Sequence, residues 1–67
     1  IPAFKMKSAN IIDVLVDSKL VSSKSEARRM VDQGAIKLDG EAVTSYDQKV
    51  KKKTVVQKGK RHFIKTT

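Results

Sequence analysis

The hydrophobic periodicity of this chain changes at Ala35, and this change limits the folds that the chain can adopt. Before Ala35, apolar side chains recur at helical spacing in two segments. After Ala35, apolar and polar residues alternate in short runs, which are separated by the turn signals Asp39-Gly40 and Lys58-Gly59. Two helices followed by short strands indicate the α+β class and not an alternating βαβ order. The 67 residues leave room for one domain with a thin core.

The first helix is predicted over residues 8–18, with either Ser8 or Asn10 as its N-cap. Its apolar stripe consists of Ile11, Ile12, Leu15 and Val16. Residues 1–7, which include a proline and two lysines, are predicted to be a linker. The domain is therefore expected to span residues 8–67.

The second helix has the clearest boundaries. Residues 23–26 fit a capping box, in which Ser23 is the N-cap and Glu26 is the third helical residue. The predicted buried stripe of this helix consists of Ala27, Met30 and Val31. Gly34 suits the left-handed residue that often follows a helix.

The remaining alternating segments predict four short strands. They cover residues 35–38, 41–43, 54–57 and 60–66. Phe63 in the last strand is predicted to point inward, and the polar residues 44–53 are predicted to form a loop.

The net charge is the strongest indication of a partner. Fifteen Lys and Arg residues against seven Asp and Glu residues leave a charge of +8. Such a basic domain is typical of a nucleic-acid binder, because phosphates are the commonest anionic partner. The alternative is a charged surface that only keeps a small domain in solution.

Composition excludes several other kinds of site. The chain has no Cys for a disulfide framework or a zinc ribbon, and His62 is the single histidine. His62 also has no acidic partner nearby in sequence, and the three glycines lie too far apart for a phosphate-binding loop. No apolar run approaches the roughly 20 residues of a membrane span. We therefore expect no catalytic site, no cofactor, no metal and no membrane contact. Ile1 in place of an initiating Met suggests a segment of a longer, intracellular protein.

Three basic clusters carry the candidate nucleic-acid contacts, and the first lies on the second helix. At about 100° per residue, Lys24, Arg28 and Arg29 point away from the buried stripe. The start of this helix also offers free N–H groups and the positive end of the helix dipole, which suit phosphate. The alternative is an ordinary solvated face, on which Arg28 pairs with Asp32.

The other two clusters follow later in the chain. The run Lys51-Lys52-Lys53 is either a solvated loop or a flexible arm that reaches phosphates. Lys58, Lys60 and Arg61 form the third cluster, at the final turn, and Lys60 and Arg61 are its predicted RNA contacts.

Residues 23–31, Gly34 and residues 36–43 together resemble the RNA-binding domain named for ribosomal protein S-four of the small ribosomal subunit. The shared order is serine, basic, serine, acidic, Ala and Arg, then a helix, a Gly, and a strand that ends here in Asp39-Gly40, where the family more often has Asn-Gly. The resemblance covers roughly residues 10–56. It implies two helices packed on a small, bent antiparallel sheet. Carried over residue by residue, it implies RNA contacts from Lys24, Ser25, Arg28, Arg29 and Lys37.

Residues 55–63 indicate a particular group of proteins that contain this RNA-binding domain. Gly59-Lys60-Arg61 followed by Phe63 is similar to the closing hairpin of the C-terminal domain of bacterial-type tyrosyl-tRNA synthetases. This likeness implies that the chain holds tRNA, specifically tyrosine tRNA. It also implies a cytoplasmic parent enzyme that attaches tyrosine to tRNA and uses ATP at sites in other domains. The segment itself is expected to be monomeric and non-catalytic, and a homodimeric parent is compatible with the resemblance.

Three other functions remain open from the sequence. The same module can belong to a pseudouridine synthase or to a ribosome-associated protein. Residues 23–33 can be the recognition helix of a helix-turn-helix DNA binder, although strands follow it. The domain can also be a structural interaction module whose positive surface is incidental.

Overall fold

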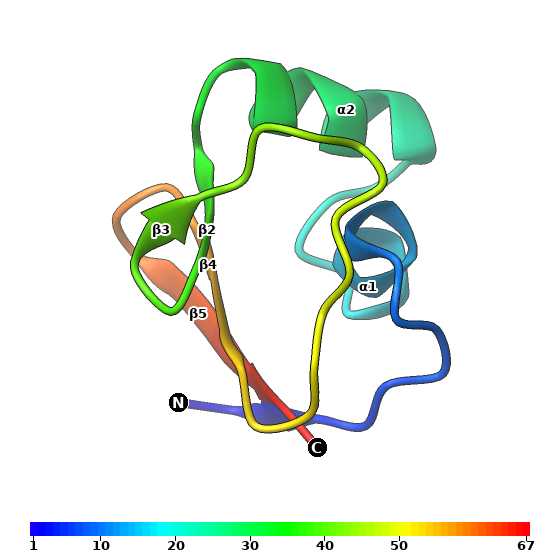
Figure 1. The fold of residues 1–67 in the computed structure, drawn as a ribbon, viewed down its shortest axis with the longest axis vertical. Coiled ribbons are helices and arrows are strands. Elements are labelled where there is room, and N and C mark those ends of the chain that lie inside the picture. The colour runs from blue at the N-terminus through cyan, green and yellow to red at the C-terminus, as the bar shows by residue number, and fades with distance from the viewer.

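The structure, a computed structural model that describes all residues 1–67, contains two helices and a five-stranded sheet (Figure 1). The helices are α1 (Ile11–Asp17) and α2 (Lys24–Asp32). The strands are β1 (Ala3–Phe4), β2 (Ile36–Leu38), β3 (Glu41–Ala42), β4 (Val55–Lys58) and β5 (His62–Thr66). This order confirms the predicted α+β class. Neither helix combines the length and apolar character needed to cross a bilayer.

The sheet differs from the expected antiparallel one at one edge. Its order is β1-β5-β4-β2-β3, and every pairing is antiparallel except that of β1 with β5, which is parallel. The Lys65 amide donates to the Pro2 carbonyl at 2.8 Å, and the Thr67 amide donates to the Phe4 carbonyl at 2.9 Å. Residues 1–7, expected to be a linker, therefore contribute a strand to the sheet. A strand of two residues is too short to show a period of its own.

Helix α1 begins three residues later than predicted, because Asn10 and not Ser8 is its N-cap. The Asn10 side chain accepts from the Ile12 amide at 2.9 Å and from the Asp13 amide at 3.4 Å. Ser8 supports the cap from outside the helix, since its hydroxyl accepts from the Asn10 amide and donates to the Asp13 carboxylate at 3.0 Å.

Both ends of α2 follow the predicted chemistry. The Ser23 hydroxyl accepts from the Glu26 amide at 3.2 Å, whereas the Glu26 carboxylate accepts from the Ser22 amide at 3.0 Å, one residue earlier than in the standard capping box. At the other end, Gly34 has a φ of +71°. The amides of Gly34 and Ala35 donate to the carbonyls of Val31 and Met30, each at 3.0 Å, which is the Schellman pattern.

Replacing Ser23 with Ala should lower the free energy of unfolding by about 1 kcal/mol, because the Glu26 amide loses its acceptor. For a domain of this size that corresponds to a Tm decrease of roughly 4–8 °C. Ser25→Ala is the matched control, since Ser25 is exposed as the second residue of the helix and its side chain takes no part in capping. Equal Tm values for the two variants in a thermal melt followed by circular dichroism would contradict the capping role.

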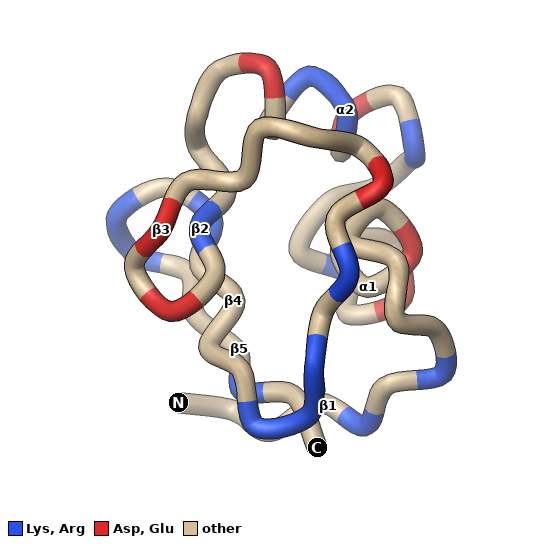
Figure 2. The backbone as a smooth tube through the Cα atoms, in the orientation of Figure 1, with Lys and Arg blue, Asp and Glu red and all other residues tan.

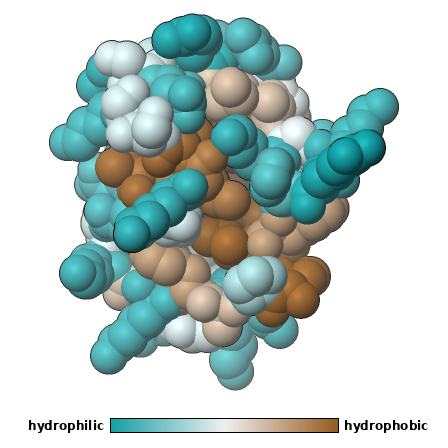
Figure 3. All heavy atoms as spheres, turned by 180° about the vertical axis from the view of Figure 1, so that it is seen from behind, coloured by the Kyte–Doolittle hydropathy of each residue, from teal (hydrophilic) through white to brown (hydrophobic).

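The core lies between the two helices and one face of the sheet. Its twelve buried residues are all aliphatic: Ile11, Ile12, Val14, Leu15, Val21, Ala27, Val31, Ile36, Val43, Val50, Val56 and Ile64. So small a core leaves other hydrophobic side chains partly uncovered, Met30 of the predicted stripe among them. Figure 3 shows apolar surface on the face opposite that of Figure 1, surrounded by hydrophilic side chains.

Phe63 does not point into the core as predicted. Ile64 and Thr66 are the buried residues of β5, and Phe63 is only half-buried. The register sets this outcome: Ile64 pairs with the buried Val56, and side chains alternate along a strand, so Phe63 lies on the outer face.

Candidate nucleic-acid interface

The exposed side of α2 carries the first candidate cluster. Ala27 and Val31 are buried against the core, which leaves Lys24, Ser25, Arg28 and Arg29 exposed. The Lys24 ammonium lies 3.9 Å from the Asp13 carboxylate, and the two side chains are 65% and 39% exposed. An ion pair with this separation and exposure contributes little and competes weakly with a phosphate.

The alternative pairing of Arg28 with Asp32 does not form. The Lys24–Asp13 contact is the one ion pair in the structure. Asp32 instead accepts a hydrogen bond of 2.6 Å from the hydroxyl of Tyr46, which comes from the loop after β3. Arg28 therefore has no carboxylate partner.

The contact with Asp32 also changes the acidity of Tyr46. The hydrogen bond to the carboxylate, then desolvation, then the negative charge of Asp32 raise the pKa of the phenol, while nearby Arg28 opposes the shift. The neutral phenol is thus favoured by folding. The stability that it contributes should be lost as the pH rises through the raised pKa of the folded state.

Replacing Asp32 with Asn should lower the pKa of Tyr46, because both the charge and the strong acceptor are lost. Tyr46 is the single tyrosine and the chain has no tryptophan, so ultraviolet absorbance of the tyrosinate reports this group alone. Asp47→Asn is the control, because the Asp47 carboxylate is adjacent in the chain but does not hold the hydroxyl. A titration midpoint that Asp32→Asn leaves unchanged would show that the contact is absent in solution.

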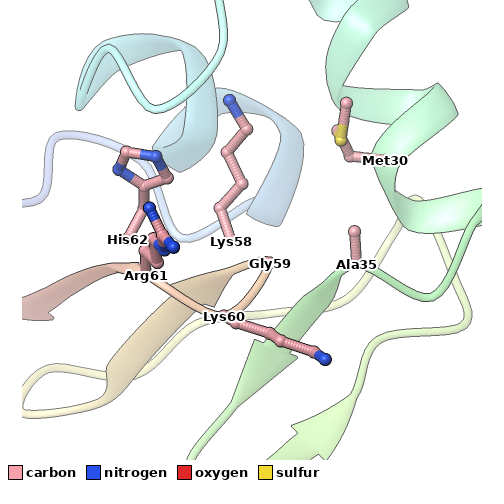
Figure 4. A pocket seen from close by; sticks show the side chains of 7 residues that line it. All are labelled: Met30, Ala35, Lys58, Gly59, Lys60, Arg61 and His62. Carbon is pink, nitrogen blue, oxygen red and sulfur yellow. The ribbon is translucent and has the colours of Figure 1, made fainter.

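The turn between β4 and β5 carries a second candidate cluster, around a pocket of about 330 Å³. The pocket is lined by Met30, Ala35, Lys58, Gly59, Lys60, Arg61 and His62, and no acidic residue is among them. In Figure 4, Met30 points from α2 toward the pocket, while Lys58, Arg61 and His62 stand on the opposite side. Lys60 extends away from them along the turn.

His62 is a pocket residue that the sequence interpretation did not include in the basic clusters, and Lys58 was part of the third cluster but not of its predicted RNA contacts. They pair with each other across the hairpin, and Lys58 pairs with the buried Ile36, so both lie on the helix side of the sheet. The Lys58 ammonium donates to the Leu20 carbonyl at 2.7 Å, which holds that side chain at the pocket wall. The alternation of side chains along β4 and β5 indicates which residues share a face. Only the cross-strand register shows that Lys58 and His62 share the face that points to the helices.

The third cluster, Lys51–Lys53, lies away from the other two. All three lysines are exposed, and Figure 2 shows their segment near the two chain ends, at the opposite end of the molecule from α2. This segment is not a free arm. The buried Thr66 hydroxyl donates to the Lys51 carbonyl at 2.6 Å, and the Lys53 amide donates to the Thr66 carbonyl at 2.7 Å.

Lys37 is also separated from α2. It is the middle residue of β2 and is half-buried between two residues that face the helices, Ile36 and Leu38. Its own side chain therefore lies on the outer face, in one cross-strand row with Gln57 and Phe63. The structure places Met30 of α2 beside the β4–β5 turn, whereas Lys24 and Arg28 line a separate hollow beside Tyr46. Lys37 and Lys51–Lys53 lie apart from both.

The chain is similar to part of several known proteins. The family described as the tyrosine–tRNA ligase SYY-like C-terminal domain matches residues 1–65. Tyrosine–tRNA ligase 2 of Clostridium acetobutylicum is 40% identical over 67 residues, which cover 97% of this chain and 17% of the relative. The tyrosine–tRNA ligase of Cupriavidus pinatubonensis is 43% identical over 70 residues, which cover 100% of this chain and 17% of the relative.

A third relative, the tyrosine–tRNA ligase of Moorella thermoacetica, is 46% identical over 54 residues, which cover 78% of this chain and 13% of the relative. The chain thus spans less than one fifth of the length of these relatives. Because the family match extends over nearly the whole sequence, the chain belongs to the tyrosine–tRNA ligase SYY-like C-terminal domain family.

Proposed function

We propose that this chain binds tRNA, as the C-terminal domain of a tyrosine–tRNA ligase. The observation that carries this proposal is the pocket beside α2, which three cationic side chains and His62 line without any carboxylate. Such a concentration of positive charge favours the binding of phosphate groups. From the family membership we infer that tRNA is the partner that carries these phosphates. The other modules considered, in a pseudouridine synthase, a ribosome-associated protein or a DNA binder, gain no support from the family match.

The primary interface, in this proposal, consists of α2 and the β4–β5 turn. Met30 of α2 lines the pocket at the turn together with Lys60 and Arg61. Lys24 and Arg28 line the hollow beside Tyr46, and Ser25 and Arg29 are exposed on the same helix. We place Lys37 and Lys51–Lys53 outside this primary interface, because they lie on the outer sheet face and near the chain ends.

The chemistry belongs to the rest of the proposed parent enzyme. We propose that this cytoplasmic enzyme attaches tyrosine to tyrosine tRNA with ATP as the energy source, and that residues 8–67 hold the tRNA. ATP and tyrosine are then bound by parts of the enzyme other than this chain. No group of three or more His, Cys, Asp or Glu side chains that suits a metal ion comes together in these 67 residues.

The binding should depend steeply on salt, and this dependence tests the proposal. If about five phosphates are neutralised, the logarithm of the binding constant should fall with the logarithm of salt concentration at a slope of roughly −3.5 to −4.5. The measurement is fluorescence anisotropy with a labelled tyrosine tRNA transcript of Clostridium acetobutylicum. Duplex DNA of equal length at matched salt is the competitor. Absent tRNA binding, a flat salt response or preference for the duplex DNA would refute the proposal.

A further inference from the structure

Tyr46 is an aromatic side chain that is both exposed and held in place. Its exposed fraction is 41%, and only Ile1 is another large hydrophobic residue left exposed. The hydroxyl is fixed by the 2.6 Å hydrogen bond to Asp32 of α2. The Tyr46 carbonyl accepts from the Asn10 side chain at 3.3 Å, so the start of α1 anchors the backbone of the same residue.

Tyr46 lines two shallow hollows, and only one of them contains cations. The hollow on the α1 side is lined by Asn10, Ile12, Asp13, Lys24, Arg28, Tyr46 and Asp47. The hollow on the other side is lined by Asp32, Thr44, Ser45, Tyr46 and Asp47 and contains no cation. Lys24 and Arg28 are the only cations in the two hollows, so a phosphate attached to a group that stacks on the ring is expected on their side, where Asp13 and Asp47 also contribute carboxylates.

The hydrogen bond to Asp32 has a second effect on this site. Asp32 follows Arg28 by one helical turn and is the nearest carboxylate on that helix face. Because Asp32 accepts from Tyr46, the Arg28 guanidinium stays unpaired beside the ring. An aromatic surface fixed in orientation next to an unpaired guanidinium is the arrangement by which proteins hold unpaired nucleotides.

We propose that Tyr46 is a stacking platform for an unpaired nucleobase of the bound RNA, and that Arg28 contacts the phosphate of the same nucleotide. This inference rests on the proposed function, because a base contact requires that the chain binds RNA. It adds a base contact to an interface that otherwise consists of phosphate contacts. The ring is already oriented by Asp32 and Asn10, so binding a base requires little further ordering of the protein.

The test compares Tyr46→Ala, Tyr46→Phe and Arg28→Ala for affinity to the Clostridium acetobutylicum tyrosine tRNA transcript at several salt concentrations. Tyr46→Ala should weaken binding roughly 5- to 150-fold, the range of a lost base–aromatic stack. Tyr46→Phe should bind more tightly than Tyr46→Ala, since the ring remains, but less tightly than wild type, since the hydroxyl that orients the ring and occupies Asp32 is lost. The two variants should have the same salt slope, because both release Asp32 and stacking itself releases no counterion. Arg28→Ala should make the slope shallower by about 0.7–0.9.

The outcomes separate this inference from the proposed function. If Tyr46→Ala binds as wild type while Arg28→Ala weakens binding, the stacking role is wrong and the tRNA-binding function stands. If wild type does not bind, the proposed function fails. A Tyr46→Phe variant that binds as weakly as Tyr46→Ala would also overturn stacking, because Tyr46 would then act only through the hydroxyl that holds Asp32.

A second measurement uses wild type only and does not depend on how the variants fold. Tyr46 is the one tyrosine in a chain without tryptophan, so the intrinsic fluorescence comes from this ring. A stacked base should quench this fluorescence in parallel with binding of the transcript. Fluorescence that persists at saturation would overturn the proposal.

Discussion

Replacing Ile36 with alanine is expected to unfold most of the protein or to leave it barely stable. Ile36 is fully buried where β2, the end of α2 and β4 meet, and the β2–β4 register places it beside Lys58 at the pocket. Removing a large aliphatic side chain from such a position costs about 2–5 kcal/mol. A domain of 67 residues has a total stability of only about 3–10 kcal/mol at typical values per residue. Urea denaturation followed by circular dichroism measures the loss.

Ile1→Ala is the matched control for this prediction. The same atoms are removed, but Ile1 is 77% exposed and outside the core, so the free energy of unfolding should change by no more than about 0.5 kcal/mol. Similar decreases in the free energy of unfolding for the two variants would show that Ile36 is not part of the buried core.

Replacing both Lys60 and Arg61 with alanine is expected to weaken tRNA binding by at least about tenfold while the fold is retained. Each side chain is exposed at the β4–β5 turn, and the pocket beside it contains no carboxylate to compete with phosphate. A hydrogen bond to a charged group contributes about 1.5–3 kcal/mol. Two lost phosphate contacts should also make the salt slope shallower by about 1.4–1.8. Anisotropy titrations of the transcript at several salt concentrations give both quantities.

Lys5→Ala/Lys7→Ala is the control for net charge. Both double variants lower the formal charge from +8 to +6 (8 − 2 = 6), but Lys5 and Lys7 lie in the N-terminal segment, at the end of the molecule away from α2 (Figure 2). The control should bind more tightly than the turn variant. Equal weakening would show that binding responds to overall charge and not to a site at the turn.

The parts of the fold that the sequence predicted are those determined by local interactions. The capping serine, Gly34 and the Asp39-Gly40 turn each act within a few residues. Asp39 and Gly40 have φ values of +50° and +88°, as a tight hairpin turn requires. The exposure of Arg28 and Arg29 followed from the same helical period that buries Ala27.

The parts that the sequence did not predict depend on contacts between distant residues. The parallel pairing of β1 joins the two chain ends, and no local pattern marks it. Tyr46 donates a hydrogen bond to Asp32, which lies 14 positions earlier in the sequence. Only the folded structure therefore shows that Tyr46 occupies the carboxylate that could otherwise pair with Arg28. The side of the sheet that Lys58 and His62 share with Ile36 is set by cross-strand register, which a strand period alone leaves undetermined.

The attachment of β1 has a mechanical consequence. The backbone hydrogen bonds that fasten this strand to the last residues of the chain include Lys65 to Pro2, Thr67 to Phe4 and Met6 to Thr67. Phe4 and Met6 pack against the edge of the core but are only partly buried. Opening such an edge requires far less free energy than unfolding the core. The N-terminal strand can therefore peel away and close again while α2 and the β4–β5 turn stay folded. In a longer protein, a chain entering through β1 would have a detachable hinge, and the surface proposed to bind tRNA could swing without losing its shape.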